Sequence, residues 1–336
     1  MWLTLFLGAL LINPGAIQTA PEKAAVELRA VRPMHTYSIV ARDPETGQLG
    51  VAVQSHWFSV GPIVPWAEAG VGAVATQSLA DPAYGPLGLA MMRAGRAAPD
   101  ALRGLLASDE NSDVRQVAMI DAKGRVAAHT GKRCIAMAGH IVDSDAQFSV
   151  QANLMEKNTV WPAMADAYRN CHGDLAEKLL AALEAAEREG GDIRGRQSAA
   201  LVIVRAESTG RPWEDRLFDL RVEDHPDPIG ELRRLVRIQR AYNHMNAGDQ
   251  AIEKQDFETA GREYAAAVEL APDIVELRFW QAVTLAQNGR LEESLPIFKD
   301  VFSQQSRWVP VIDRIADVGI LTIGSADVAQ IKAQAR

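Results

Sequence analysis

The chain has 336 residues, of which 48% are hydrophobic and 23% are charged, and its formal net charge is −8. The length suggests two domains, and a net negative charge without a basic stripe excludes the electrostatic pattern of a nucleic-acid-binding protein. The two cysteines, Cys134 and Cys171, are too few for a disulfide framework or a cysteine-rich metal site, and the sequence leaves open whether they pair.

The residues before position 36 read as a targeting segment. Residues 2–12 form an apolar run of signal-peptide length, well short of the roughly 20 residues that span a bilayer, so no stable membrane span is expected. Small residues follow up to Ala20, which predicts a signal peptide over 1–20, a leader or pro-segment over 21–35, and export to the periplasm or the medium. The alternative is translation from Met34, which would make the protein cytoplasmic.

From residue 36 onward, strand and helix patterns come in blocks. Strands are predicted over 36–41, 49–55, 70–78, 114–120, 125–130, 148–154, 199–205 and 216–222. Helices are predicted over 87–94, 100–107, 160–169 and 175–189. Because hairpins and helix pairs outnumber strand–helix–strand crossovers, the pattern favours an α+β domain over 36–228, with helices layered on antiparallel sheets.

After the turn-rich segment 224–228 the pattern is helical only. Apolar residues recur there with the 34-residue period of tetratricopeptide repeats: Phe257 with Leu291, Tyr264 with Phe298, and Val268 with Phe302. The period predicts an all-α, tetratricopeptide-like domain over 229–336. Two matched units are fewer than the three that are usually stable alone, so we expect this domain to pack on the first one. A protein partner or a homodimer contact is its candidate functional role.

Short motifs in the first domain follow one another in a characteristic order. They occupy 36–44, 46–47, 50–53, 75–77, 84–86, 88–89, 115–116, 129–131, 134, 138–140, 191–192, 194–195 and 197–201. In this order they resemble the uncharacterised prokaryotic family called domain of unknown function 1028. The resemblance implies a four-layer αββα sandwich of the N-terminal-nucleophile hydrolase type, although a fold does not by itself fix a reaction. The chain departs from the family after the strand that begins at Phe148, where a glycine is expected beside the asparagine but the chain has Gln151, Ala152 and Asn153.

The resemblance implies that Thr36 is the nucleophile of an amide-bond hydrolase. In such enzymes the hydroxyl of the first residue attacks the substrate, and its own α-amine, which titrates near 7.7 to 8.0, serves as the general base. An amide nitrogen is not basic, so the bond between His35 and Thr36 must be cut. Thirty-five residues precede Thr36 in this chain, and removal of a signal peptide after Ala20 would still leave residues 21–35 in front of it. Self-cleavage is therefore the remaining route to an N-terminal Thr36.

Several polar residues are candidates for the rest of such a site. A tetrahedral intermediate requires hydrogen-bond donors at its oxyanion, and Asn153 is predicted as a catalytic donor. The predicted substrate-binding residues are Gln77, Ser78, Asp81, Arg196, Gln197 and Ser198. Gln77 and Ser198 are further oxyanion donors, Arg196 would bind an anionic group, and Asp81 would orient an amine. Each also has a structural interpretation, such as closing a turn or satisfying backbone groups.

Other chemistries have weaker support. The seven histidines show no metal-binding spacing on a helix, and there is no phosphate-binding glycine loop or nucleophile elbow, so no metal and no cofactor is expected. Two hypotheses remain. The first is an amide-bond hydrolase acting on a small amide or peptide-like substrate. The second is a non-catalytic scaffold or protein-interaction module that works through its helical repeats.

Overall fold

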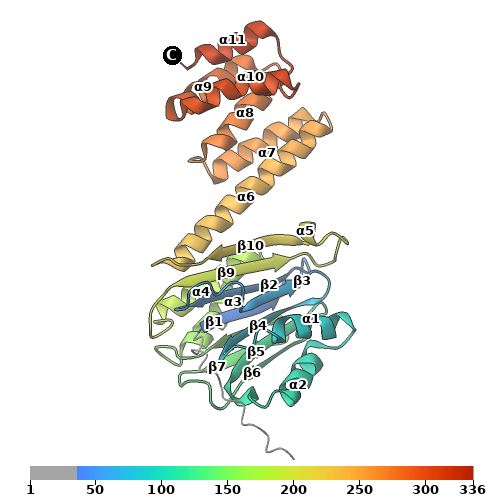
Figure 1. The fold of residues 1–336 in the computed structure, drawn as a ribbon, viewed down its shortest axis with the longest axis vertical. Helices are drawn as coiled ribbons and strands as arrows, with labels where there is room; N and C mark the ends of the chain where they lie inside the picture. Colours follow the sequence, from blue (N-terminus) through green and yellow to red (C-terminus); the bar gives the residue numbers. More distant parts are fainter. Residues whose placement is uncertain (1–35, 336) are drawn as a thin grey trace, which may run out of the picture. The chain divides into compact units, whose positions relative to one another are not determined.

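A computed structural model of the chain describes residues 36–335. The predicted signal peptide, the leader and Met34 lie outside the described residues. Two antiparallel sheets with helices against them are followed by a helical region, as Figure 1 shows. This arrangement confirms the predicted mixture of α and β structure and the all-helical C-terminal part. In residues 36–335 no helix is both long and apolar enough to cross a lipid bilayer.

The larger sheet has six strands in the order β10-β9-β2-β1-β8-β7. These strands are β1 (Thr36–Arg42), β2 (Leu49–Ser55), β7 (Gly139–Asp143), β8 (Phe148–Ala152), β9 (Ser198–Val204) and β10 (Arg216–Val222). The smaller sheet has the order β3-β4-β5-β6. Its strands are β3 (Pro65–Glu68), β4 (Gly72–Ser78), β5 (Arg115–Asp121) and β6 (Val126–Thr130). Strand β1 therefore lies inside the larger sheet, between β2 and β8.

The hairpin of β1 and β2 follows from its turn sequence. The Asp43 carboxylate accepts hydrogen bonds from the Glu45 backbone N–H and the Thr46 hydroxyl, both at 3.1 Å. Gly47 then adopts a φ of +73°, a conformation that side chains other than glycine rarely take. This turn fixes a register in which the first residue of β1, Thr36, pairs with the last residue of β2, Ser55.

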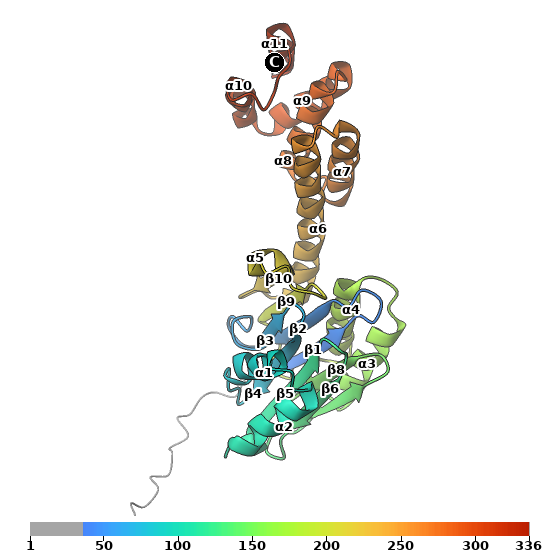
Figure 2. The same ribbon diagram turned by 90° about the vertical axis from the view of Figure 1, so that its right-hand side faces the viewer.

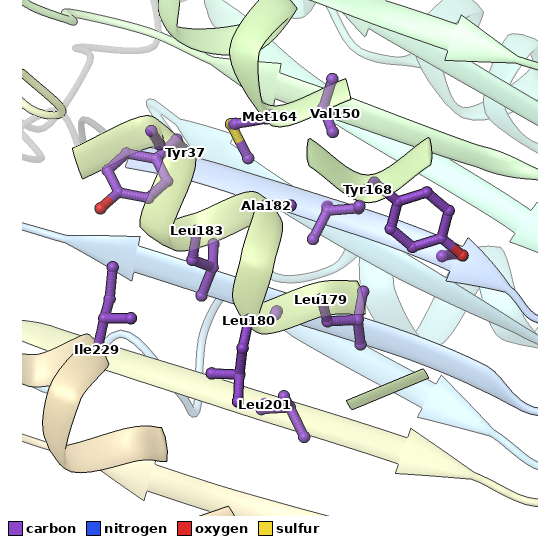
Figure 3. Packing of buried hydrophobic residues seen from close by; sticks show 14 of the residues in the cluster. Tyr37, Val150, Met164, Tyr168, Leu179, Leu180, Ala182, Leu183, Leu201 and Ile229 are labelled. Carbon is purple, nitrogen blue, oxygen red and sulfur yellow. The ribbon is translucent and has the colours of Figure 1, made fainter. Parts of the chain in front are cut away.

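Helices cover the outer faces of both sheets. They are α1 (Tyr84–Arg93), α2 (Ala98–Ser108), α3 (Val160–Asn170) and α4 (Leu175–Arg188). The short α5 (Pro212–Asp215) lies in the connection between β9 and β10, and a 3-10 turn at Ser112–Val114 precedes β5. Helices α1 and α2 bury apolar side chains against β4 and β5, and α3 and α4 pack against the larger sheet (Figures 1 and 2). Figure 3 shows the second contact, where Leu179, Leu180 and Leu183 of α4 meet side chains of the sheet.

The two sheets face each other through a second apolar core. Alternate residues of each strand point to opposite faces, so Ile39 of β1 belongs to the core under α4, whereas Val40 belongs to the core between the sheets. Both faces of β1 and β2 are buried, which explains why apolar residues stand at successive positions in the middle of these strands, such as Ile39, Val40 and Ala41.

The C-terminal helices are α6 (Pro228–Glu253), α7 (Phe257–Leu270), α8 (Val275–Gln287), α9 (Leu291–Gln304), α10 (Val309–Asp317) and α11 (Ser325–Ala333), with a 3-10 turn at Ser306–Trp308. The first half of α6 packs on the larger sheet through Ile229, Leu232 and Val236. Tyr264 of α7 and Phe298 of α9, which are related by the 34-residue period, are both buried. The tetratricopeptide character of the region stays a prediction.

Strands β3 and β7, the short helix α5 and the start of α1 differ from the sequence predictions. Strands β3 and β7 were not predicted, since β3 has only four residues and starts with Pro65, and β7 starts with Gly139. Helix α1 begins at Tyr84 rather than at residue 87. Pro86 does not prevent this because the first N–H groups of a helix have no intrahelical partner.

Candidate functional site

A layer of polar side chains lies between the two sheets, at the end where β1 begins. Elsewhere this space is filled by apolar side chains such as Val40, Val51 and Val53. Toward the start of β1 the inward positions carry fully buried hydroxyl and carboxamide groups instead: Thr36, Ser38, Ser55, Gln77, Gln116, Ser149, Gln151 and Asn153. We call this set the polar layer. Polar groups buried in this way require hydrogen-bond partners, and their network determines the geometry of the site.

Thr36 is held at both of its oxygens. Its hydroxyl donates to the hydroxyl of Ser55, its cross-strand partner, at 3.1 Å. Its carbonyl oxygen accepts from Gln77 Nε2 at 3.0 Å, from the Asn153 backbone N–H at 3.1 Å and from Asn153 Nδ2 at 3.4 Å. The donors come from β4 of one sheet and from the end of β8 in the other. The two sheets together therefore fix the backbone of the predicted nucleophile.

Gln116 connects the side chains that hold Thr36. Its Oε1 accepts from Gln77 Nε2 at 2.7 Å and from Asn153 Nδ2 at 2.9 Å. Its Nε2 donates to the carbonyl oxygen of Ala152 and to Thr130 Oγ1, both at 2.9 Å. Because two donors surround Oε1 and oxygens surround Nε2, the network itself assigns the orientation of this carboxamide. Gln116 in turn orients the carboxamides of Gln77 and Asn153.

A second chain of hydrogen bonds fixes the other end of Gln77. Ser38 donates to Gln77 Oε1 at 2.6 Å, and Gln151 Nε2 donates to the Ser38 hydroxyl at 2.6 Å. Ser149 donates to Gln151 Oε1 at 3.0 Å. The hydrogen bond from Ser38 of β1 to Gln77 of β4 crosses between the sheets. The polar layer is thus one connected network, in which each amide has a defined direction.

The network extends to a half-buried histidine at the margin of the layer. The Thr130 hydroxyl lies 2.8 Å from His140 Nδ1. Burial lowers the pKa of His140 below its ordinary value, and the nearby His129 lowers it further. A neutral ring can accept a hydrogen bond at Nδ1 from the Thr130 hydroxyl, which itself accepts a hydrogen bond from Gln116 Nε2. Hydrogen bonds therefore connect His140 to the groups around Thr36.

The predicted residues Asn153 and Gln77 reach Thr36, although not in the way expected for oxyanion donors. The described N–H contacts of the two side-chain amides go to the Thr36 carbonyl oxygen, to Gln116 Oε1 and, at 3.3 Å, to the carbonyl oxygen of Gln151. These contacts position the main chain of Thr36. Oxyanion stabilisation by either residue stays a prediction.

The structure does not bring Ser78 and Asp81 to Thr36. Ser78 is fully buried and follows Gln77 on β4, so its side chain points to the opposite face of the sheet. The Asp81 carboxylate accepts from the Ala83 backbone N–H at 2.9 Å and thereby closes the turn before α1. This turn role is the structural interpretation that the sequence also offered.

Arg196, Gln197 and Ser198 also make contacts away from Thr36. Arg196 forms ion pairs with Glu187 of α4 and, at 3.7 Å, with Asp227. Gln197 Nε2 donates to Asp224 at 3.3 Å. Ser198 is the partner of Ser55 on β9, two strands away from β1, and accepts from the Val60 backbone N–H at 3.1 Å. This hydrogen bond holds the loop that follows β2 against β9.

Sequence reasoning missed Ser55 and Gln116, which are central to the polar layer. A polar residue inside an otherwise apolar, doubly buried strand was the available signal, since such a residue needs a buried partner. Which strands face each other is not encoded in that pattern, so the partners could not be named. Both cysteines are free. In residues 36–335 no three or more His, Cys, Asp or Glu side chains gather as a metal site.

Comparison with known proteins shows a family match that covers all residues of the polar layer. Residues 36–232 match the model of the family of unknown function DUF1028, which is more than half of the chain. This protein belongs to that family. The DUF1028 match begins at Thr36, the first residue of β1. Helices α7 to α11 lie beyond its end.

A crystal structure of a DUF1028 protein from Silicibacter pomeroyi resembles this chain. The two share 31% sequence identity with a TM-score of 0.53, over 60% of this chain and 88% of that one. None of the curated proteins matches the chain significantly. The family resemblance seen in the sequence motifs is thus confirmed, and the family carries no assigned function.

Proposed function

We propose that this protein is an amide-bond hydrolase of the N-terminal-nucleophile type, with Thr36 as nucleophile and a small amide or peptide-like compound as substrate. The observation that carries the proposal is the position of Thr36. It opens an interior strand of a two-sheet domain, its hydroxyl is hydrogen-bonded to Ser55, and its carbonyl is held by Gln77 and Asn153. The four layers of helix, sheet, sheet and helix agree with a fold of that type.

The reaction requires that the peptide bond between His35 and Thr36 be cut first. Thr36 Oγ1 then attacks the substrate carbonyl carbon, and the hydroxyl proton passes to the new α-amine, whose pKa of about 8 suits a base at neutral pH. The tetrahedral intermediate collapses, the C–N bond breaks, and the departing amine takes the proton back from the ammonium group. Water, deprotonated by the same amine, hydrolyses the resulting ester and frees the Thr36 hydroxyl.

Ser55 and the polar layer supply the positioning that this chemistry needs. Productive attack requires the nucleophile within a few tenths of an ångström of the right place, and side chains locked by packing and hydrogen bonds provide that. The hydrogen bond from the Thr36 hydroxyl to Ser55 Oγ holds Thr36 Oγ1 in place. The three hydrogen bonds to the Thr36 carbonyl keep the first residue in place after its preceding bond is cut.

The test combines N-terminal analysis with activity. Intact-mass measurement of the purified full chain should find a species that starts at Thr36, and that species should hydrolyse members of a panel of small amides. Thr36→Ala should abolish turnover, because it removes the attacking oxygen, whereas Thr36→Ser should retain a measurable rate. Thr76→Ala is the matched control: it removes a buried threonine hydroxyl on the other face of β4, which donates to the Asp81 carbonyl oxygen, and should keep activity.

The alternative is a non-catalytic scaffold that works through its tetratricopeptide-like helices. A homogeneous chain in which Thr36 remains internal, together with no turnover in any preparation, would favour that alternative. Turnover that survives in Thr36→Ala would reject Thr36 as the nucleophile.

A further inference from the structure

A cavity of about 760 Å³ lies away from the polar layer, beside β10 at one edge of the larger sheet and β3 at one edge of the smaller sheet. Its walls come from β3, from β9 and β10, and from α1 and α5. The volume falls within the roughly 300–1,000 Å³ of small-molecule sites. Val202, which lines it, is four residues along β9 from Ser198, on the order of 13 Å. The cavity is therefore a separate place from the surroundings of Thr36.

The floor of the cavity is apolar. Val202 and Val204 of β9 contribute to it from the larger sheet, and both are almost fully buried. Pro65, Ala69 and Leu89 contribute buried apolar surface from the other side. An apolar portion of a ligand would displace water from these groups, which is the main source of affinity in sites of this kind.

One wall carries two arginines that share one carboxylate. Arg216 and Arg221 of β10 line the cavity, and Asp219 between them forms an ion pair with Arg216 and lies 3.4 Å from Arg221 Nε. Arg93, on the opposite side, is neutralised by its bidentate pair with Glu68. The carboxylate of Asp215 accepts hydrogen bonds from the Ser208 hydroxyl and from the hydroxyl and backbone N–H of Thr209. On β10 itself, two arginines against the single carboxylate of Asp219 leave guanidinium N–H donors unused, while Asp215 beside them keeps a negative charge that its hydrogen bonds do not cancel.

Two glycines allow the side chains of this cavity to take their positions. A Cβ on Gly61 would come within 2.9 Å of Arg221 Cδ, so the absence of a side chain there lets the arginine stem lie across the backbone. A Cβ on Gly85 would come within 2.4 Å of the Trp66 ring. Trp66 is fixed further by donating from Nε1 to the Ile63 carbonyl oxygen at 2.9 Å. The arginine and the indole that line the cavity are thus held before any ligand arrives.

We propose that this cavity binds a small amphipathic monoanion, a carboxylate with an apolar body. The carboxylate is bound by the guanidinium groups of Arg221 and Arg216, which suit it because the planar fork of arginine matches a carboxylate in bidentate fashion. The apolar body lies on the floor beside Trp66. The proposal does not depend on the chemistry assigned to Thr36.

The test uses the full chain with 4-phenylbutyrate as the probe and isothermal titration calorimetry as the measurement. Binding of 4-phenylbutyrate is expected in the millimolar range or tighter. The neutral analogue 4-phenyl-1-butanol should bind at least about tenfold more weakly, because it lacks the charge that the arginines bind. Arg221→Gln should weaken 4-phenylbutyrate binding by a similar factor and leave the affinity for the alcohol nearly unchanged.

Arg211→Gln is the matched control. Arg211 is also a surface arginine near β10, paired with Glu214 at 2.9 Å, and its side chain does not line the cavity. Its substitution should leave 4-phenylbutyrate affinity unchanged. Arg216→Gln provides a second variant if Arg221→Gln does not fold, as judged by circular dichroism. The proposal is overturned if 4-phenylbutyrate does not bind, if the alcohol binds equally well, or if Arg211→Gln weakens binding as much as the cavity variants.

Discussion

At the scale of single residues, Gln116 and Gln54 show how differently two fully buried glutamines can be placed. Gln116 Oε1 accepts hydrogen bonds from the Gln77 and Asn153 amides, and Gln116 Nε2 donates to Thr130 and to a backbone oxygen. Gln54 on β2 is equally buried, yet among the described residues neither of its amide atoms has a hydrogen-bond partner. Burial alone therefore does not identify a residue of the polar layer. Its hydrogen bonds to other members of the layer do.

This contrast predicts opposite outcomes for one substitution at two positions. Gln116→Met should lower the free energy of unfolding by about 1–3 kcal/mol, because it deprives the Gln77 and Asn153 amides of a shared acceptor inside the protein. Gln54→Met keeps similar volume and removes two unpaired polar atoms, so it should be neutral or stabilising. Urea unfolding of both variants measures the difference. Equal losses in the two would contradict the role given to Gln116.

At the scale of elements, a group of ion pairs joins α4 to α6. Arg240 Nη1 lies 2.7 Å from Glu177, and Nη2 lies 2.7 Å from Asp174. Arg233 binds Glu177 at 2.8 Å and Glu184 at 2.6 Å. Burial by itself raises the pKa of Glu177, but hydrogen bonds and charges from the two arginines outweigh it, so its pKa is lowered. The carboxylate form of Glu177 is thus stabilised in the folded protein.

These contacts predict a pH-dependent effect of Arg240→Met. At neutral pH the variant should be less stable by roughly 1 kcal/mol, a modest value because the side chains are partly exposed. The pKa of Glu177 is lower in the folded than in the unfolded protein. The stability that its carboxylate contributes is therefore complete above its ordinary pKa of about 4.3, and it is lost as the pH falls through the pKa of the folded state. The difference between variant and wild type should therefore shrink below about pH 4.

Chemical unfolding at several pH values measures this effect. Arg234→Met serves as the control, because Arg234 lies on the same helix and pairs only locally, with Glu231 three residues before it. It should change stability by no more than about 0.5 kcal/mol. A stability difference for Arg240→Met that is the same at pH 7 and pH 3 would refute the assignment to Glu177.

At the scale of the whole molecule, the apolar cores of the described chain divide near the middle of α6. The core under α4 includes α6 residues up to Val236, whereas the clusters of the helical region start with Ala241. The core between the sheets and the one under α1 and α2 use no residue beyond Val204. The two parts of the chain are therefore stabilised by different sets of side chains.

This division predicts that a chain ending at Arg240 folds. It retains the three cores of the two-sheet part and both arginines that bind α4. We expect a cooperative thermal transition by circular dichroism and the same processing at Thr36 as in the full chain. A truncated chain without a cooperative transition would show instead that the helical region contributes to the stability of the sheets.

Much of the fold could be predicted because its signals are local. All eight predicted strands are present, since alternation, β-branched runs and the Asp43–Gly47 turn act over a few residues. Strands β3 and β7 were missed because short edge strands with proline or glycine have no such pattern. Thr36, Gln77 and Asn153, which the sequence indicated, lie together in the polar layer, and their catalytic roles stay predictions. Arg196 and Gln197 were grouped with them because they precede a buried strand, but they form ion pairs and hydrogen bonds elsewhere.

By itself the sequence determined that an α/β region is followed by a helical region, which family the chain belongs to, and that a hydroxyl stands at the start of β1. Only the tertiary structure decided which polar side chains meet. Ser38 and Gln77 are 39 positions apart in the chain, and Gln77 and Gln151 lie in different sheets. Hydrogen bonds are short and directional, so the pairing depends on how the two sheets face each other and on their register. That relation arises from the packing of the whole domain, and no local pattern of residues specifies it.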